Sequence, residues 1–163
     1  MTSRSFRLVP LALTVALLAG GCGGSKATTQ VVAGSGFHFS APAGWAVSHR
    51  GSQITAASGD DLIEVSVFPL VKPYRPSLFS AVTRELKVRM DALAVQQHAT
   101  VQEAGTAVPS GVKSHVWQLT GGGHLDEYTF VLSGRTEYQL LCRRPSGGDA
   151  AACKQLVATF ALR

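Results

Sequence analysis

A short apolar run that ends at a cysteine near the N-terminus constrains this chain more than any other feature. Two arginines precede the run, which occupies residues 8–18, and the small residues 19–21 separate it from Cys22. This order is that of a secretory signal peptide, and the run is shorter than the roughly 20 apolar residues of a transmembrane helix. We therefore expect residues 1–21 to be removed and the protein to be exported.

The end of this segment resembles the signal of bacterial lipoproteins, in which Leu, a small residue and Gly or Ala precede the cysteine. Ala19 stands at the leucine position, with Leu18 one place upstream, while Gly20 and Gly21 suit the peptidase. The resemblance implies a diacylglyceryl group on the Cys22 thiol and a protein anchored to the outer face of the cell membrane. Because Gly23 rather than aspartate follows, passage to the outer membrane of a Gram-negative cell would be permitted. A soluble exported protein cleaved elsewhere is the alternative.

Net charge argues against nucleic acid as a partner. Residues 1–21 hold two arginines and no acidic residue, so the formal net charge falls from +5 to +3 once they are removed. The remaining basic residues are spread along the chain, whereas a nucleic-acid site needs a clustered basic face. We expect the membrane to be reached through the lipid anchor.

The other two cysteines predict a structural disulfide. With Cys22 set aside for lipid, Cys142 and Cys153 remain as an even pair in an oxidising compartment. The segment between them is polar and rich in turn residues, and a redox or metal pair is disfavoured because there is no C-x-x-C spacing and no histidine nearby.

The chain divides into a signal peptide (1–21), a lipidated cysteine with a Gly- and Ser-rich flexible tether (22–35) and one folded domain (36–163). Alternating apolar and polar residues predict strands over 37–40, 45–48, 53–57, 62–68, 101–108, 112–120, 125–133 and 138–142. A helical stripe predicts a long helix from Ser77, its N-cap, to Gln97, and a last helix begins near Asp149. Hairpin connections predict an antiparallel sheet with packed helices, an α+β fold.

The strand pattern also assigns side chains to faces of the sheet. Tyr128, Phe130 and Leu132 share one face, and we expect Tyr138, Leu140 and Cys142 to repeat that face on the next strand. In the last helix, the residues expected to point toward the sheet are Cys153, Leu156, Val157 and Phe160.

The segment from Gly36 to Trp45 resembles the start of PsbP/Mog1-like domains, in which an aromatic strand leads into a Pro-x-x-Trp turn. The long middle helix and the closing segment Tyr138…Cys142…Cys153…Phe160 resemble actinobacterial lipoproteins of that superfamily, and the resemblance spans residues 36–162. It implies an α/β/α sandwich around a twisted antiparallel sheet, and an adaptor or binding module that is not an enzyme and needs no cofactor. Trp45 is then a core or hairpin-packing residue.

Two polar clusters are weighed for catalysis. On a strand, His124 and Asp126 point the same way, as a chelating pair would, and His115 on the neighbouring strand could complete a metal site. Asp60 and Asp61 with Glu64 could act as paired carboxylates, although adjacent aspartates after a glycine more often form a solvated turn. An envelope hydrolase or metal-dependent enzyme using His124 and Asp126 is therefore the alternative function.

The loop 70–76 is the preferred recognition site. It combines the cations Lys72 and Arg75 with Tyr74 and is stiffened by prolines, although Tyr74 could simply cover the start of the helix. We expect a non-enzymatic binding or adaptor module for an envelope protein or a lipid-like ligand. An exposed apolar groove beside the 69–76 loop, rimmed by Arg75 and Lys72, would be the feature that favours this function over the others. A purely structural assembly factor is a third possibility.

Overall fold

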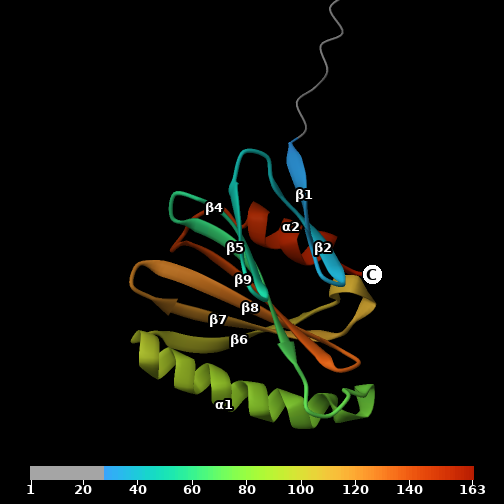
Figure 1. Ribbon diagram of the computed structural model, residues 1–163. Coiled ribbons are helices and arrows are strands. Elements are labelled where there is room, and N and C mark those ends of the chain that lie inside the picture. The colour runs from blue at the N-terminus through green and yellow to red at the C-terminus, as the bar shows by residue number, and fades with distance from the viewer. Residues whose placement is uncertain (1–27) are drawn as a thin grey trace, which may run out of the picture.

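The structure is a computed structural model that describes residues 28–163, and it contains two antiparallel sheets and two α-helices (Figure 1). The large sheet has seven strands in the order β3-β4-β5-β9-β8-β7-β6, and the small sheet has three in the order β1-β2-β10. The strands are β1 (Thr29–Gly34), β2 (Phe37–Pro42), β3 (Ala46–Arg50), β4 (Gln53–Ser58), β5 (Asp61–Pro69), β6 (Thr100–Ala107), β7 (Ser114–Gly121), β8 (His124–Ser133), β9 (Thr136–Pro145) and β10 (Ala161–Leu162). The helices are α1 (Phe79–Gln97) and α2 (Ala151–Thr159), with 3₁₀ turns η1 (Pro76–Leu78) and η2 (Pro109–Gly111).

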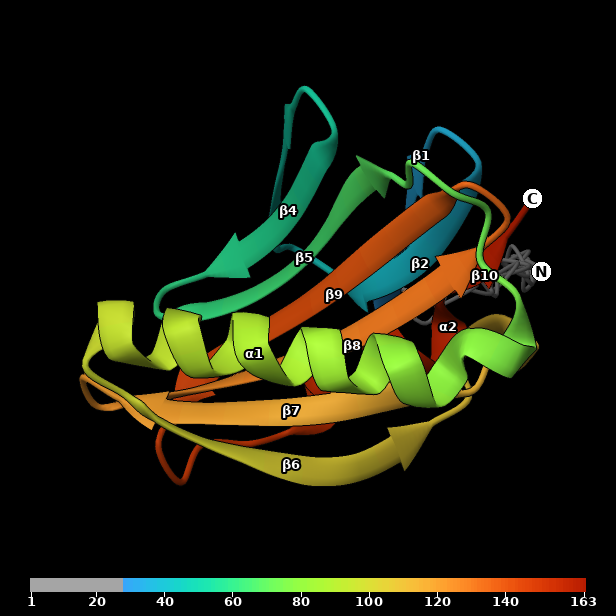
Figure 2. The ribbon, with the colours of Figure 1, turned by 90° about the horizontal axis from the view of Figure 1, so that it is seen from below.

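The molecule is layered, with α1 on one face of the large sheet and α2 with the small sheet on the other (Figures 1 and 2). Alternation along the strands gives each face its own apolar core. The core under α2 and the small sheet includes Phe37, Phe39, Ile63, Leu140 and Phe160. The core under α1 includes Leu86, Met90, Trp117, Tyr128 and Phe130. The predicted α+β fold with an antiparallel sheet is thus confirmed.

The long helix α1 buries the stripe that its sequence predicts. Leu86, Met90 and Ala94 are buried at helical spacing, and His98 ends the helix in the left-handed conformation. The prediction that Ser77 caps the helix is wrong, because Ser77 lies inside η1 and the N-cap position of α1 is Leu78. Pro76 fixes its φ in the helical range, so the chain is already turning when it reaches Ser77.

The register of the β8–β9 hairpin overturns one assignment of faces. A two-residue turn, Gly134-Arg135, places Val131 opposite Tyr138 and Phe130 opposite Gln139. Opposed residues in a ladder share a face, so Tyr138 and Cys142 point away from Phe130 and join the core under α2. The expectation that Tyr138, Leu140 and Cys142 repeat the face of Tyr128, Phe130 and Leu132 is therefore wrong.

The predicted tether is shorter than expected at its C-terminal end. Residues Thr29–Gly34 form β1, which pairs antiparallel with β2 from Thr29↔Pro42 to Gly34↔Phe37. Val32 is buried in the core while Val31 faces out. Pairing with β2 provides hydrogen-bond partners for the backbone N–H and C=O groups of a segment whose composition alone resembles a linker. Cys22 and the signal peptide lie outside the described residues, so the lipidation stays a prediction.

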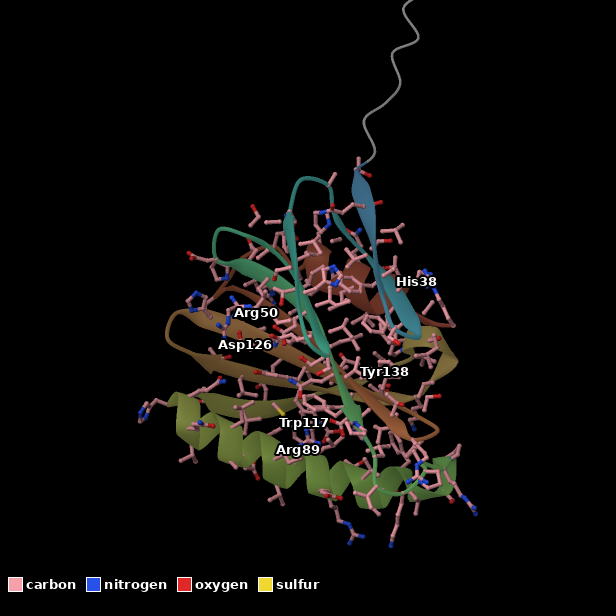
Figure 3. The ribbon with its side chains drawn as sticks, viewed as in Figure 1. His38, Arg50, Arg89, Trp117, Asp126 and Tyr138 are labelled. Atoms are coloured by element: carbon pink, nitrogen blue, oxygen red, sulfur yellow. A yellow bond between two sulfur atoms is a disulfide. The ribbon has the colours of Figure 1, made fainter. Side chains whose placement is uncertain are left out.

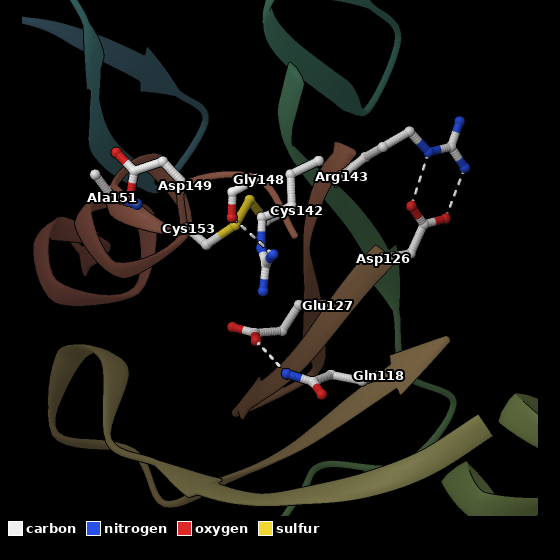
Figure 4. The surroundings of a disulfide bond; sticks show 10 residues. Gln118, Asp126, Glu127, Cys142, Arg143, Gly148, Asp149, Ala151 and Cys153 are labelled. Atoms are coloured by element: carbon white, nitrogen blue, oxygen red, sulfur yellow. Dashed lines mark hydrogen bonds and ion pairs between the residues drawn. A yellow bond between two sulfur atoms is a disulfide. The ribbon is translucent and has the colours of Figure 1, made fainter. Parts of the chain in front are cut away.

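The predicted disulfide is present and joins β9 to α2 (Figure 4). The Cα atoms of Cys142 and Cys153 are 5.4 Å apart, and both side chains are buried. Helix α2 begins where the Asp149 carboxylate accepts a hydrogen bond from the Ala151 N–H, 3.0 Å long. Leu156 of α2 and the following Phe160 pack toward the sheet, as predicted. Across residues 28–163, no helix has both the length and the apolar character needed to cross a membrane.

Candidate functional site: a groove under the 69–76 loop

A groove of about 570 Å³ lies between the 69–76 loop, the first half of α1 and the ends of β8 and β9. We call it the loop groove. Most of its lining is apolar, and the complete lining is Phe68, Pro69, Leu70, Val71, Lys72, Pro73, Tyr74, Leu78, Val82, Glu85, Leu86, Arg89, Leu132 and Glu137. Its volume lies in the range of about 300–1,000 Å³ that is usual for ligand pockets.

The loop is held against the β8–β9 turn by hydrogen bonds at both of its ends. The Leu70 N–H donates to the Arg135 carbonyl (2.8 Å), and the Tyr74 N–H donates to the Gly134 carbonyl (2.7 Å). Between them, Arg135 Nη2 donates to the Val71 carbonyl (2.7 Å). These bonds and three prolines restrict the loop, so the groove is already formed without an occupant.

The wall of the groove holds one ion pair between α1 and β9. Arg89 donates from Nη1 and Nη2 to the two carboxylate oxygens of Glu137, each at 3.0 Å. The Glu137 side chain is only 6% exposed, whereas that of Arg89 is 46% exposed. The guanidinium carbon of Arg89 also lies 5.5 Å from the centre of the Phe130 ring, so the cation is held over the aromatic core under α1. Figure 3 shows Arg89 beside α1.

The rim of the groove is apolar and basic. Phe68, Val71 and Leu78 are exposed apolar residues, and Val71 is 88% exposed. Of the predicted binding residues, Lys72 and Tyr74 line the groove, and Tyr74 is half-buried. Arg75 is exposed and follows Tyr74 directly, outside the lining itself. An apolar groove therefore lies beside the loop, with Lys72 but not Arg75 in its lining.

His124 and Asp126 lie together on β8 as predicted, beside a second cavity of about 350 Å³ near the end of α1. Asp126 accepts two hydrogen bonds from Arg143, one from Nε at 2.7 Å and one from Nη2 at 2.6 Å (Figure 4). The pKa of Arg143 is raised above its ordinary value, and the hydrogen bonds with Asp126 are the largest cause. Both oxygens of the Asp126 carboxylate are therefore engaged by a cation, which leaves it poorly suited to bind a metal.

His115 does not join that pair, which corrects the expectation that it could complete a metal site. His115 lies near the start of β7, whereas His124 pairs with Gly121 at the end of β7. The two histidines are therefore at opposite ends of the β7–β8 ladder. The ring of His115 contacts Thr83 Oγ1 through Nε2 (2.6 Å) and Glu103 through Nδ1 (2.7 Å), and it stacks on Phe79. Across residues 28–163, no three His, Cys, Asp or Glu side chains come together as a metal site.

The three carboxylates near the β4–β5 turn are not brought together as an acid–base pair. Asp60 is exposed in the turn, while Glu64 is buried on β5. Glu64 accepts hydrogen bonds from three neutral donors: Gln53 Nε2 at 2.6 Å, Ser66 Oγ at 3.0 Å and Thr55 Oγ1 at 3.2 Å. This arrangement gives Glu64 a structural role in joining β4 to β5.

Sequence reasoning missed Arg89 and Glu137, which build the wall of the groove. They are 48 residues apart, and each reads alone as a surface charge. The one available signal is Glu137 itself, a charge in the strand that follows a tight turn. Its meaning depends on the hairpin register, which puts Glu137 opposite Leu132.

Comparison with known proteins supports the fold. No protein-family model and no curated relative matches the chain. The solution structure of cyanobacterial PsbP (CyanoP) from Synechocystis sp. PCC 6803 is similar, with a TM-score of 0.58 and 13% identity over 89% of this chain and 99% of that one. A crystal structure from Bacteroides thetaiotaomicron VPI-5482 has a TM-score of 0.53 and 15% identity over 83% of this chain, which spans only 48% of that chain. At these identities the likeness concerns the fold alone, and that fold is PsbP-like.

Proposed function

We propose that this protein is an exported, membrane-anchored lipoprotein whose domain is a non-enzymatic binding module, with the loop groove as its binding surface. The observation that carries the proposal is a preformed groove whose rim exposes apolar side chains to solvent. Exposed, contiguous apolar surface on a soluble domain usually marks an interaction site. The PsbP-like fold supports a binding role only by analogy, because function resides in a site and not in a fold.

The anchor supports this role because it would hold the domain near the membrane. The first described strand, β1, begins at Thr29, so six residues, 23–28, separate Cys22 from Thr29. Six extended residues span at most roughly 20 Å. A lipidated Cys22 would therefore keep the start of β1 close to the bilayer and the binding module at the envelope surface.

Two measurements test the proposal. The intact mass of protein extracted from its own membranes should correspond to a chain that starts at Cys22 and carries acyl groups. Native mass spectrometry of the same material should retain a bound protein or ligand, and Val71→Asp should abolish that retention. Val95→Asp is the matched control, because Val95 is a similarly exposed valine (77%) on α1 outside the groove lining. An unlipidated start elsewhere would refute the anchor, and equal retention by both variants would refute the groove.

A further inference from the structure

We infer that the loop groove binds an acidic, apolar segment of another envelope protein. This inference rests on the proposed function and names the class of partner that the same surface takes. It follows from the charge around the groove, from the outward direction of its apolar rim and from the end of the domain at which it lies.

The charges around the groove leave a basic excess. Arg89 and Glu137 neutralise each other, and Glu85 is the other acidic residue of the lining. On the loop side, Lys72, Arg75 and Arg135 are exposed cations, and within residues 28–163 none of the three forms an ion pair. The first turn of α1, beside the loop, contains no acidic residue. A basic rim of this kind attracts acidic side chains and repels basic ones.

The apolar residues favour a protein over a lipid-like ligand. Lipid chains and small apolar ligands are bound where most of their surface is enclosed. In the loop groove, Phe68, Val71 and Leu78 instead lie exposed on the rim. A lipid chain bound inside the groove would leave these three side chains in water. A protein segment can insert one apolar side chain into the groove and cover the rim with its other residues. Such a segment buries both the groove and the rim, as in the core and surroundings of an interface hot spot.

The position of the groove gives the direction from which a partner comes. The start of β1, which continues toward Cys22, lies at the top of the domain in Figure 1, and the loop leading into α1 lies at the bottom. In the view from below, α1 lies in front of the large sheet and β1 lies behind it, so the two views agree (Figure 2). The groove therefore lies at the end of the described domain away from the start of β1. A lipidated Cys22 would leave it on the side of the domain away from the bilayer, where another envelope protein can reach it.

Site-specific photo-cross-linking of the full-length protein in its own membranes tests the inference. A photoreactive p-benzoylphenylalanine replaces Val71, with Val95 as the control position, and the cross-linked partner segment is sequenced by mass spectrometry. We expect a protein adduct at position 71 and none at 95, with apolar residues flanked by Asp or Glu in the attached segment. The double reversal Lys72→Glu/Arg75→Glu should lower the yield by roughly tenfold. The control reversal Arg50→Glu/Lys154→Glu, on β3 and α2, should leave it unchanged.

The outcomes separate the inference from the proposed function. A lipid adduct at position 71, or a protein adduct whose yield ignores the charge reversal, refutes the acidic protein partner while leaving a binding groove in place. No adduct at position 71 refutes both. A synthetic peptide of the sequenced segment, titrated against the purified domain, should then bind the parent protein and lose roughly tenfold in affinity with Lys72→Glu/Arg75→Glu.

Discussion

Arg89 on α1 and Glu137 on β9 form a two-bond ion pair that joins the helix to the sheet beside the loop groove. The two partners differ in exposure, since the Glu137 side chain is nearly buried and that of Arg89 is half-exposed. Removal of the arginine would therefore leave a buried carboxylate without its cation, whereas removal of the carboxylate would leave a cation that still reaches water.

We accordingly predict that Arg89→Ala destabilises the domain more than Glu137→Gln does. An uncompensated buried charge costs several kcal/mol, and the exposure of Arg89 reduces this to about 1–3 kcal/mol. Urea unfolding of both single variants and of the double variant Arg89→Ala/Glu137→Gln measures the difference. The double variant should be more stable than Arg89→Ala, and a strictly additive result would show that the pair contributes nothing.

The disulfide gives a second prediction about stability. Cys142 and Cys153 are 11 residues apart, and a cross-link closing such a loop contributes about 3 kcal/mol in the chain-entropy model. Cys142→Ala/Cys153→Ala should lower the free energy of unfolding by that amount, and a reducing agent should lower the melting temperature of the parent protein alone. A melting temperature for the variant equal to that of the oxidised parent would contradict the prediction.

Tyr128 predicts how stability changes at alkaline pH. The pKa of Tyr128 is raised above 10.0, first by burial and then by the nearby Asp126 carboxylate, while the Gln97 side chain opposes the shift. In the unfolded chain Tyr128 loses its proton near pH 10, but in the folded protein it keeps the proton to higher pH. Above pH 10 the unfolded state therefore binds fewer protons than the folded state. The contribution of Tyr128 to the free energy of unfolding is complete below pH 10 and is lost as the pH rises through the pKa of the folded state.

Urea unfolding at about pH 8 and about pH 11 measures this effect. The parent protein should lose more stability between the two conditions than Tyr128→Phe, which has no phenol to ionise. The comparison is made within each protein, because the loss of the hydroxyl also changes stability at the lower pH. Equal losses in the two proteins would show that Tyr128 titrates alike in the folded and unfolded states.

Much of the fold could be predicted from the sequence because strong local patterns determine it. Residues 62–68 alternate cleanly, and the structure has β5 over Asp61–Pro69. The stripe through Leu86 and Met90 likewise identifies α1. In both segments one face is continuously apolar, so burial and local propensity favour the same structure.

The remaining features depend on contacts between distant segments. The face of Tyr138 follows from a two-residue turn, and a shift of one residue in register would send it to the other core. The groove likewise needs Arg89, Glu137 and the loop to meet in space. The loop could be proposed for recognition from its prolines, aromatic residue and cations, but its carbonyl contacts with the β8–β9 turn have no sequence pattern.

The strand β1 shows why composition alone misjudged the tether, and it supplies the last prediction. Its residues are small and polar apart from adjacent valines, so they resemble a linker until β2 is in place to pair with them. Val32 is 4% exposed and packs in the core under α2, whereas Val31 is 71% exposed. Val32→Asp should therefore lower the free energy of unfolding by about 3 kcal/mol, because it places a charge in an apolar core, and Val31→Asp should change it by less than about 0.5 kcal/mol. Denaturant unfolding and amide exchange across residues 29–34 measure both effects. If the two variants were equally stable, with unprotected amides in the parent protein, residues 29–34 would be a flexible tether after all.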